Sequence, residues 1–318
     1  MQQVTAIVRQ ELSQHVPSCV CDFVDQLVHR HAAGWAAILF YGSCLRRNEA
    51  ELSDPDSLLD FYVLVDDYDR AYPGRAWLAR FNRLLPPNVF YVETLAGGAR
   101  LCAKYAVISV AQFVHGCSRK SHTSAIWARF AQPARLIRFR DEKSREAVEF
   151  ACAEAVATFI ASSLALQANR FTAERLWKDG FRATYGAELR SEDGIARAAA
   201  IVDSDMVRYR ALAAATLDDG AVAGDSTGDA VYFQNPLDAG AIRAGQRAWV
   251  RRRLAGKSLN LLRLIKGVFT FDGAVDYALW KVERHAGIRP PVSAWERRHP
   301  ILASPQLLWR FYRAGAFR

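Results

Sequence analysis

The stretch Ile38–Asp67, ILFYGSCLRRNEAELSDPDSLLDFYVLVDD, decides the fold of this 318-residue chain. An apolar run leads into Gly42 and Ser43, and a polar loop follows. Asp60 then opens a second apolar run, FYVLV. Apolar runs of this length that are bounded by turn residues predict two buried strands, with a Gly-Ser corner after the first.

The Gly-Ser corner and Asp60 together suggest phosphate chemistry. A glycine lets backbone N–H groups approach a phosphate closely, and a carboxylate at the start of the next strand can hold Mg²⁺ against that phosphate. This arrangement resembles that of the polymerase-β-like nucleotidyltransferases. The resemblance implies an α+β fold in which helices flank a small mixed sheet.

One departure concerns the metal ligands. Nucleotidyltransferases of this type usually carry two carboxylates separated by one residue, whereas the position two before Asp60 is Leu58. A second ligand is therefore expected either from the loop, from the end of the second strand or from a neighbouring strand. The candidates in the first two places are Asp54, Asp56, Asp66 and Asp67.

Length and composition predict a globular protein with more than one part. Of the 318 residues, 51% are hydrophobic and 24% are charged, which suits a sizeable core and excludes a disordered chain. We expect a nucleotidyltransferase domain over residues 1–140 and a mostly helical domain over 141–240. A basic helical region over 241–318 follows, with an amphipathic helix at its end.

Charge and cysteine content indicate what kind of partner the protein binds and in which compartment it lies. The net charge of +9 implies an anionic partner, which charge alone does not identify among nucleotide, nucleic acid and acidic membrane. Six scattered cysteines favour reduced thiols and a cytoplasmic compartment. The N-terminus predicts no signal peptide, and the apolar run 151–166, interrupted by Glu154, predicts a buried helix rather than a membrane span.

Two further polar residues lie in runs that otherwise read as strands. Glu93 lies in VFYVETL and is a candidate third carboxylate, although alternation does not say which face of the sheet it joins. Lys104 lies inside an apolar run. A lysine in such a place either extends its amine to the edge of the core or contacts an anion such as a triphosphate.

The second half of the chain predicts helices and a basic surface. Thr172 is expected to cap the helix that follows it. Residues 241–271 carry eight basic side chains and no acidic one, which favours anion binding over a plain solvated face. The tail 304–318, SPQLLWRFYRAGAFR, predicts a short basic aromatic helix that either lies on a membrane or docks on the fold.

Ordered blocks over most of the chain carry a closer resemblance. They are FYGSC from Phe40, LLDFYVLVDD from Leu58, RLCAKYAVIS from Arg100, ARFAQP from Ala128, FTAERL from Phe171, TYGAELR from Thr184 and KGVFTFDG from Lys266, followed by Tyr277 and Lys281. Together they resemble the mitochondrial-type CDP-diacylglycerol synthases, the translocator assembly and maintenance family of phosphatidate cytidylyltransferases. That family also has one Asp where other nucleotidyltransferases have two.

This resemblance implies transfer of CMP from CTP to phosphatidic acid, with Mg²⁺ as cofactor and pyrophosphate as the second product. It implies Asp60 and Lys104 as catalytic residues, and Asp60, Asp67 and Glu93 as metal ligands. Nucleotide and phosphate contacts are expected from Tyr41, Gly42, Ser43, Tyr105, Arg129 and Lys266. The expected partners are CTP, phosphatidic acid and an anionic membrane surface, with no nucleic acid, and the expected location is peripheral on the inner face of the membrane.

Departures from the family pattern keep two alternatives open. Cys44 replaces a glycine and is expected to narrow the phosphate loop, and the segments DYDRAYPGRAW and FYVETL differ from their family counterparts. One alternative is a nucleotidyltransferase that acts on a soluble or RNA substrate. The other is a non-catalytic membrane-associated protein on a degenerate nucleotidyltransferase fold.

Overall fold

The computed structural model divides the chain into two compact units. Unit 1 comprises Met1–Gln14, Val110–Pro133 and Glu142–Leu262, and unit 2 comprises His15–Ser109, Ala134–Asp141 and Arg263–Arg318. The residues that it describes are 1–31, 34–52, 54, 57–96, 99–188, 193–217, 221–222, 231–270, 275–277, 279–280, 291–298, 306 and 309–310. The expected helix of the tail therefore lies mostly outside the described residues.

Neither unit follows the consecutive ranges 1–140, 141–240 and 241–318 that were expected from the sequence. The first helix, α1 (Gln2–Leu12), belongs with the helices of unit 1, and the strand β5 (Ala134–Phe139) belongs with the sheet of unit 2. Both assignments arise from packing between segments that are far apart in the chain. Local periodicity carries no signal for such contacts, so the sequence suggested consecutive domains.

Unit 2 is built on a mixed five-stranded sheet, which confirms the predicted α+β fold class. The strands are β1 (Trp35–Tyr41), β2 (Leu58–Val65), β3 (Asn88–Ala96), β4 (Ala99–Ser109) and β5, in the order β3-β4-β2-β1-β5. β2 and β4 run parallel, whereas the other neighbouring pairs are antiparallel. The two strands predicted around the Gly-Ser corner are β1 and β2, and they pair with each other.

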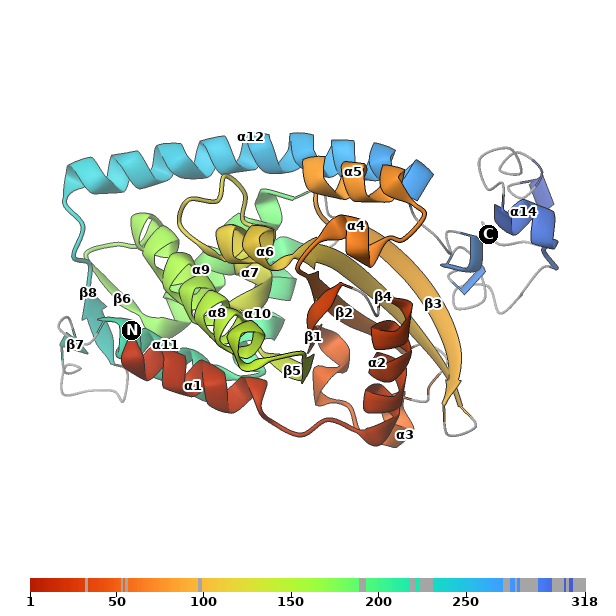
Figure 1. The fold of residues 1–318 in the computed structure, drawn as a ribbon. Helices are drawn as coiled ribbons and strands as arrows, with labels where there is room; N and C mark the ends of the chain where they lie inside the picture. The colour runs from red at the N-terminus through yellow and green to blue at the C-terminus, as the bar shows by residue number, and fades with distance from the viewer. Residues whose placement is uncertain are drawn as a thin grey trace. The chain divides into compact units, whose positions relative to one another are not determined.

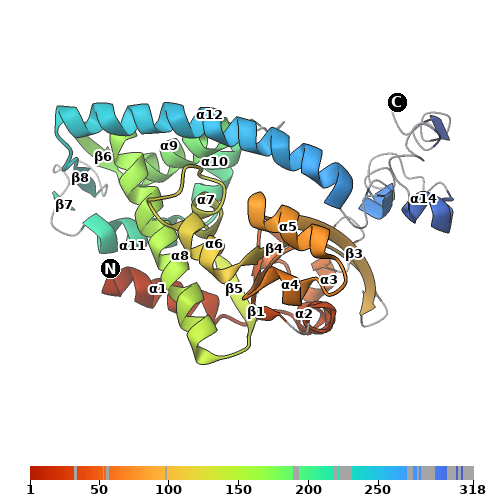
Figure 2. The ribbon, with the colours of Figure 1, turned by 45° about the horizontal axis from the view of Figure 1, so that its top comes forward.

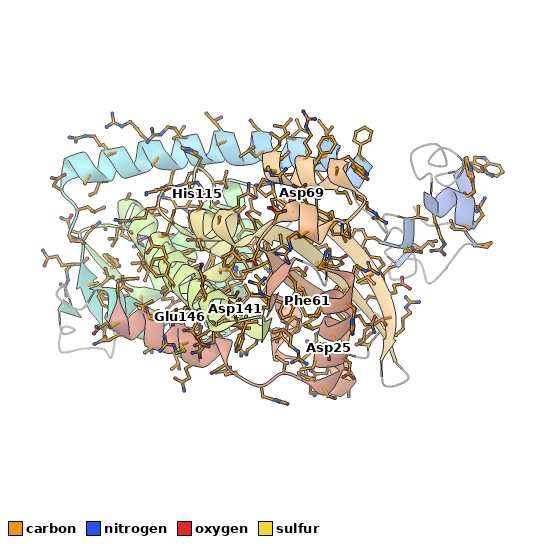
Figure 3. The ribbon with its side chains drawn as sticks, in the orientation of Figure 1. Asp25, Phe61, Asp69, His115, Asp141 and Glu146 are labelled. Atoms are coloured by element: carbon orange, nitrogen blue, oxygen red, sulfur yellow. The ribbon has the colours of Figure 1, made fainter. Side chains whose placement is uncertain are left out.

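Helices cover one face of this sheet (Figure 1). Phe23 of α2 stacks on Phe61 of β2 with 5.3 Å between the ring centroids, and Figure 3 shows Phe61 inside the unit. The helices and short turns of unit 2 are α2 (Ser18–Arg30), η1 (Ser43–Arg46), α3 (Glu49–Leu52), α4 (Tyr68–Ala71), α5 (Ala76–Leu84) and α14 (Ala294–Arg298). Apolar side chains of α2, α4 and α5 join those of β1, β2 and β4 in one core.

Unit 1 is mostly helical, with α8 (Glu142–Ser163) at its centre (Figure 2). The span Glu142–Leu166 is long and apolar enough to cross a membrane, but 67% of its most apolar window is buried inside the protein. Other described elements of unit 1 include α1, α6 (Val110–Cys117), α7 (Trp127–Phe130), η2 (Leu164–Leu166), β6 (Arg170–Thr172), α9 (Ala173–Gly186), α10 (Gly194–Asp203), α11 (Met206–Leu217), β7 (Ala221–Val222) and β8 (Tyr232–Gln234). The burial of α8 fits the predicted core helix.

Two local predictions for the second half can be compared with the structure. Thr172 caps α9, since its hydroxyl accepts a hydrogen bond from the backbone N–H of Arg175 at 3.2 Å. The basic run lies on α12 (Ala239–Thr270), a continuous helix whose residues up to Leu262 belong to unit 1 and whose remainder belongs to unit 2.

Candidate functional site

Four polar side chains form a row across the sheet of unit 2. Asp60 pairs with Tyr41 on one side and with Lys104 on the other, and Lys104 pairs with Tyr91. Directly paired residues of neighbouring strands point to the same face of a sheet. Tyr41, Asp60, Lys104 and Tyr91, which we call the Asp60 row, therefore share the face opposite the helix-covered core.

Asp60 and Lys104 form the charged centre of this row. Lys104 Nζ lies 3.5 Å from Asp60 Oδ1, and their side chains are 35% and 23% exposed, respectively. A partly exposed ion pair of this kind contributes roughly 0–1 kcal/mol to stability. The pair therefore adds little to stability, and with a side chain that is 35% exposed Lys104 reaches solvent from an otherwise apolar strand, so its role in binding or chemistry stays a prediction.

Gly42 brings the chain directly against Asp60. Its φ of 94° and ψ of −165° belong to a region that only glycine adopts readily. A Cβ at this position would lie 3.1 Å from Asp60 Oδ2. The exposed Ser43 begins the turn η1 next to it, so the predicted Gly-Ser corner and the predicted carboxylate do meet.

Cys44 does not narrow the corner in the way expected from the sequence. Its side chain is buried in the core, and its thiol donates a hydrogen bond to the carbonyl oxygen of Leu58 at 3.2 Å. Burial raises the pKa of this thiol, which keeps it protonated and unreactive at neutral pH. The Cys44 side chain therefore lies in the core and not in the space beside Gly42.

Glu93 lies on the same face as the Asp60 row, which the sequence left undecided. The hydroxyl of Tyr91 donates to Glu93 Oε1 at 2.9 Å, and Arg100 Nε lies 3.8 Å from Glu93 Oε2. Burial raises the pKa of Tyr91, with further contributions from Cys102 and Glu93, so this hydroxyl stays protonated. Glu93 pairs with Cys102, two residues along β4 from Lys104. Strand spacing then separates the Cα atoms of Asp60 and Glu93 by about 12 Å.

An aromatic cluster adjoins Tyr91 at the end of the row. Tyr277 lies 5.4 Å and Trp280 lies 6.5 Å from Tyr91 between ring centroids, and the two stack on each other at 5.9 Å. Neither Tyr91 nor Trp280 was predicted from the sequence as a site residue. The alternation that places Tyr91 on the face of Glu93 could have indicated Tyr91. No local pattern in the sequence indicates Trp280.

Asp67 is a wrong prediction as a metal ligand. It follows the far end of β2, seven residues from Asp60, and strand geometry then separates the two by about 23 Å. Its carboxylate caps α4 by accepting hydrogen bonds from the backbone N–H groups of Asp69 and Arg70. Asp66 lies at the same end and pairs with Arg140. Asp54 is exposed in the loop, and Asp56 lies outside the described residues.

Tyr105 and Lys266 do not join the Asp60 row either. Tyr105 follows Lys104 on β4, so it points to the opposite face and packs in the core. Lys266 is buried, and its Nζ donates to the carbonyl oxygens of Leu85 and Pro87 and to Oδ1 of Asn88. Both residues therefore have structural contacts that the sequence resemblance did not reveal.

Arg129 belongs to unit 1, where it lies half-buried on α7. Its predicted contact with nucleotide stays a prediction. Lys281, from the last of the resembling blocks, lies outside the described residues.

Asp60 is the carboxylate of the row that could hold a magnesium ion, with substrate and water completing the coordination. Within the described part of the chain, no group of three His, Cys, Asp or Glu side chains is placed to hold a metal. Magnesium in nucleotide sites is often bound by one or two carboxylates plus substrate phosphates and water. Asp60 alone, partly exposed beside Gly42, meets that minimal requirement.

Comparison with known proteins adds no independent assignment. No family model matches the chain, and no curated protein matches it.

Proposed function

We propose that this protein is a magnesium-dependent nucleotidyltransferase that transfers CMP from CTP to phosphatidic acid. The observation that carries the proposal is the meeting of Gly42, Asp60 and Lys104, in which a glycine corner lies against a carboxylate that is paired with an ammonium group. The choice of CTP and phosphatidic acid as substrates rests on the sequence blocks that resemble phosphatidate cytidylyltransferases.

In this proposal the side chains of the Asp60 row position and neutralise phosphate groups. Asp60 would hold Mg²⁺, and bound magnesium would supply charge neutralisation of the triphosphate. Lys104 Nζ, next to Asp60, would stabilise the negative charge that develops on the leaving pyrophosphate. The backbone at Gly42 and Ser43 would approach the phosphates closely, because no side chain at Gly42 stands in the way.

The proposed acceptor, the lipid phosphate, requires few further catalytic groups from the protein. The lipid phosphate is already anionic, so attack on the α-phosphate of CTP requires no strong general base. Positioning and charge stabilisation would then supply most of the rate enhancement. In this proposal Asp60, with a magnesium ion, and Lys104 would supply that positioning and charge stabilisation.

We also propose that α12 brings the protein to an anionic membrane surface, which places it on the cytoplasmic side as a peripheral protein. Val250, Leu254 and Leu261 are 59%, 65% and 54% exposed, and helical geometry places them within about 40° of one another. Arg243 and Arg247 continue the same exposed side of the helix. A helix face that combines apolar and basic side chains suits the boundary between headgroups and acyl chains.

Release of pyrophosphate tests the catalytic proposal. Purified protein with Mg²⁺ and mixed micelles of phosphatidic acid is given each of the four nucleoside triphosphates. We expect turnover with CTP alone, and a loss of at least about 100-fold in Asp60→Asn, because one preorganised group of this kind contributes that much. Asp22→Asn removes an equal charge from the exposed side of α2 and should keep full activity.

Other results would favour one of the two alternative functions. Turnover without lipid, or strongly salt-dependent binding of RNA with no response to lipid, would favour a nucleotidyltransferase with a soluble or RNA substrate. Failure to bind CTP in the presence of Mg²⁺ would favour a non-catalytic protein on this fold.

Flotation with vesicles tests the membrane proposal separately. The double variant Leu254→Glu/Leu261→Glu should lose binding to vesicles that contain phosphatidic acid, since it places two carboxylates on the exposed apolar face. Ile195→Glu/Val207→Glu is the matched control, because Ile195 on α10 and Val207 on α11 are 63% and 82% exposed and lie outside α12. Equal binding by the double variant and the control would refute the role of α12.

A further inference from the structure

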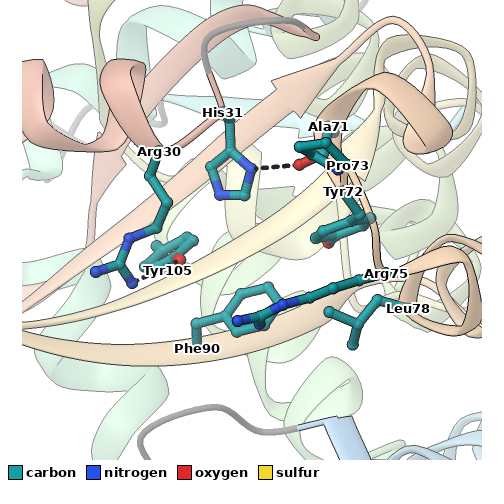
Figure 4. Close-up of a pocket in the computed structure, with 9 residues that line it drawn as sticks. All are labelled: Arg30, His31, Ala71, Tyr72, Pro73, Arg75, Leu78, Phe90 and Tyr105. Carbon is teal, nitrogen blue, oxygen red and sulfur yellow. Dashed lines mark hydrogen bonds between the residues drawn. The ribbon is translucent and has the colours of Figure 1, made fainter.

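Unit 2 contains a cavity of about 380 Å³ that the proposed reaction does not use (Figure 4). Its volume falls in the range of pockets that bind small organic molecules. The cavity lies among the end of α2, the segment from Ala71 to Leu78, and the strands β3 and β4. Its residues belong to unit 2 alone.

This cavity is on the opposite side of the sheet from Asp60. Tyr105 lines it, and the neighbouring residue Lys104 belongs to the Asp60 row. Consecutive residues of a strand point to opposite faces, so a ligand in the cavity would be separated from Asp60 by the sheet itself. The cavity is therefore a second candidate site and not an extension of the first.

Flat ring surfaces form much of its wall. Phe90 and Tyr105 stack with 5.1 Å between their ring centroids, and Tyr72 lies 6.1 Å from Phe90. His31 meets Tyr72 and Tyr105 edge-on at 5.9 Å and 5.8 Å. Walls of this kind favour a flat ring, which can stack on the faces or meet their edges.

Two guanidinium groups give the cavity a positive character. Arg30 and Arg75 both line it, and Figure 4 shows that they come from different segments, with Arg75 reaching across toward Phe90. Arg30 donates to the hydroxyl of Tyr105 at 3.4 Å, which orients it toward the wall. The described lining residues include no carboxylate. Guanidinium pairs are well suited to phosphate and carboxylate groups.

His31 adds a specific polar requirement. Its Nδ1 lies 3.0 Å from the carbonyl oxygen of Ala71, which can only accept a hydrogen bond, so Nδ1 carries the proton. Its Nε2 is buried and has no hydrogen-bond partner within the part of the chain that the structure describes. Burial lowers the pKa of His31, so Nε2 stays an acceptor at neutral pH. A buried acceptor without a partner is costly, and a donor on a ligand would satisfy it once the side chains that cover Nε2 shift.

We propose that this cavity binds a small organic anion with a flat ring, whose phosphate or carboxylate group contacts Arg30 and Arg75 and whose ring carries a hydrogen-bond donor that faces His31. The phosphate could come from a nucleoside monophosphate, and the carboxylate could come from an amino-substituted aromatic acid. Both share the ring, the anionic group and the donor.

Isothermal titration calorimetry of the full-length protein tests the proposal with CMP, AMP, 4-aminobenzoate, benzoate and inorganic phosphate. At least one of the first three should bind, and Arg30→Gln/Arg75→Gln should weaken that binding about tenfold or more. The matched control is Arg80→Gln/Arg182→Gln, which removes the same charge from exposed arginines outside the cavity. Asp60→Asn should leave the binding unchanged, which separates this site from the Asp60 row.

Each part of the proposal can fail independently. Binding of none of the three ringed probes with a donor would overturn it, as would equal weakening in the control double variant. Loss of binding in Asp60→Asn would assign the ligand to the other face of the sheet. Inorganic phosphate that binds as tightly as CMP would refute a ring subsite, and benzoate that binds as tightly as 4-aminobenzoate would refute the donor to His31.

Discussion

Substitution of Gly42 by alanine tests how the corner and the carboxylate depend on each other. Gly42 has φ 94° and ψ −165°, a conformation that costs a residue with a Cβ about 1–3 kcal/mol. At about 2–4 °C per kcal/mol for a protein of this size class, the melting temperature should fall by about 2–12 °C.

A second effect of the same substitution concerns the chemistry. The new Cβ would lie 3.1 Å from Asp60 Oδ2, closer than carbon and oxygen normally approach, so the carboxylate must move by a few tenths of an ångström. A displacement of 1 Å at a reacting group can cost about 100-fold in rate. For the smaller shift we expect kcat/KM for pyrophosphate release to fall between about threefold and tenfold.

Two other glycines separate these effects. Gly74 has φ 73°, and a Cβ there would meet nothing within 4 Å. Gly74→Ala should therefore lower the free energy of unfolding by about 1–2 kcal/mol through its backbone alone, and leave activity unchanged. Gly186, at the end of α9, also has open space around it and a negative φ. Gly186→Ala should be neutral or stabilising by about 0.5 kcal/mol.

The glycine variants test separately the backbone strain at Gly42 and the contact of residue 42 with Asp60. If Gly42→Ala melts at the wild-type temperature, the positive φ is not a constraint. If it loses stability but retains the full activity of Gly74→Ala, the contact with Asp60 does not set the position of the carboxylate. Circular dichroism melts and the pyrophosphate assay, performed on the same preparations, supply both readings.

Three further predictions concern stability in the rest of the molecule. Thr172→Ala should lower the free energy of unfolding in urea by about 1 kcal/mol, because α9 loses its N-cap. Thr172→Ser should lower it little, and equal losses in the two variants would contradict the capping role. Lys266→Met should lower the free energy of unfolding by about 3 kcal/mol, because three oxygen acceptors lose their donor. Lys257 is exposed on the same helix, and Lys257→Met should change this free energy by less than about 0.5 kcal/mol. Burial lowers the pKa of His31 below its unfolded value near 6.5, so its protonation favours the unfolded chain, and stability should fall as the pH drops from about 7.5 to 5.5. The drop should be smaller in His31→Gln, and an unchanged drop would show that other groups cause it.

The parts of the site that the sequence predicted are those that follow from short-range pattern. The apolar runs on either side of the Gly-Ser corner predicted β1 and β2, and the run from Arg100 predicted a strand that carries Lys104. The register that brings Asp60 beside Lys104 was not predictable in the same way. It depends on a parallel pairing between β2 and β4, strands that are separated by α4, α5 and β3.

The wrong or incomplete predictions share a physical cause, which is that sequence distance does not measure spatial distance. Asp67 is seven residues from Asp60, but an extended strand carries it to the far end of the sheet. Tyr105 is adjacent to Lys104, yet alternation turns it to the other face. Lys266 is basic and lies in a basic run, but its own contacts are the oxygens of a turn in unit 2. A sequence motif gives the residue types, whereas the strand geometry of the sheet determines which of these side chains lie close together.

The charge balance of the Asp60 row bears on what the site could bind. Asp60 and Lys104 neutralise each other at 3.5 Å, and Glu93 lies beside Arg100. These two pairs therefore carry almost no net charge, although a nucleoside triphosphate carries several negative charges. A triphosphate would be attracted only if a divalent cation joined Asp60 and released Lys104 from its partner to contact phosphate oxygen.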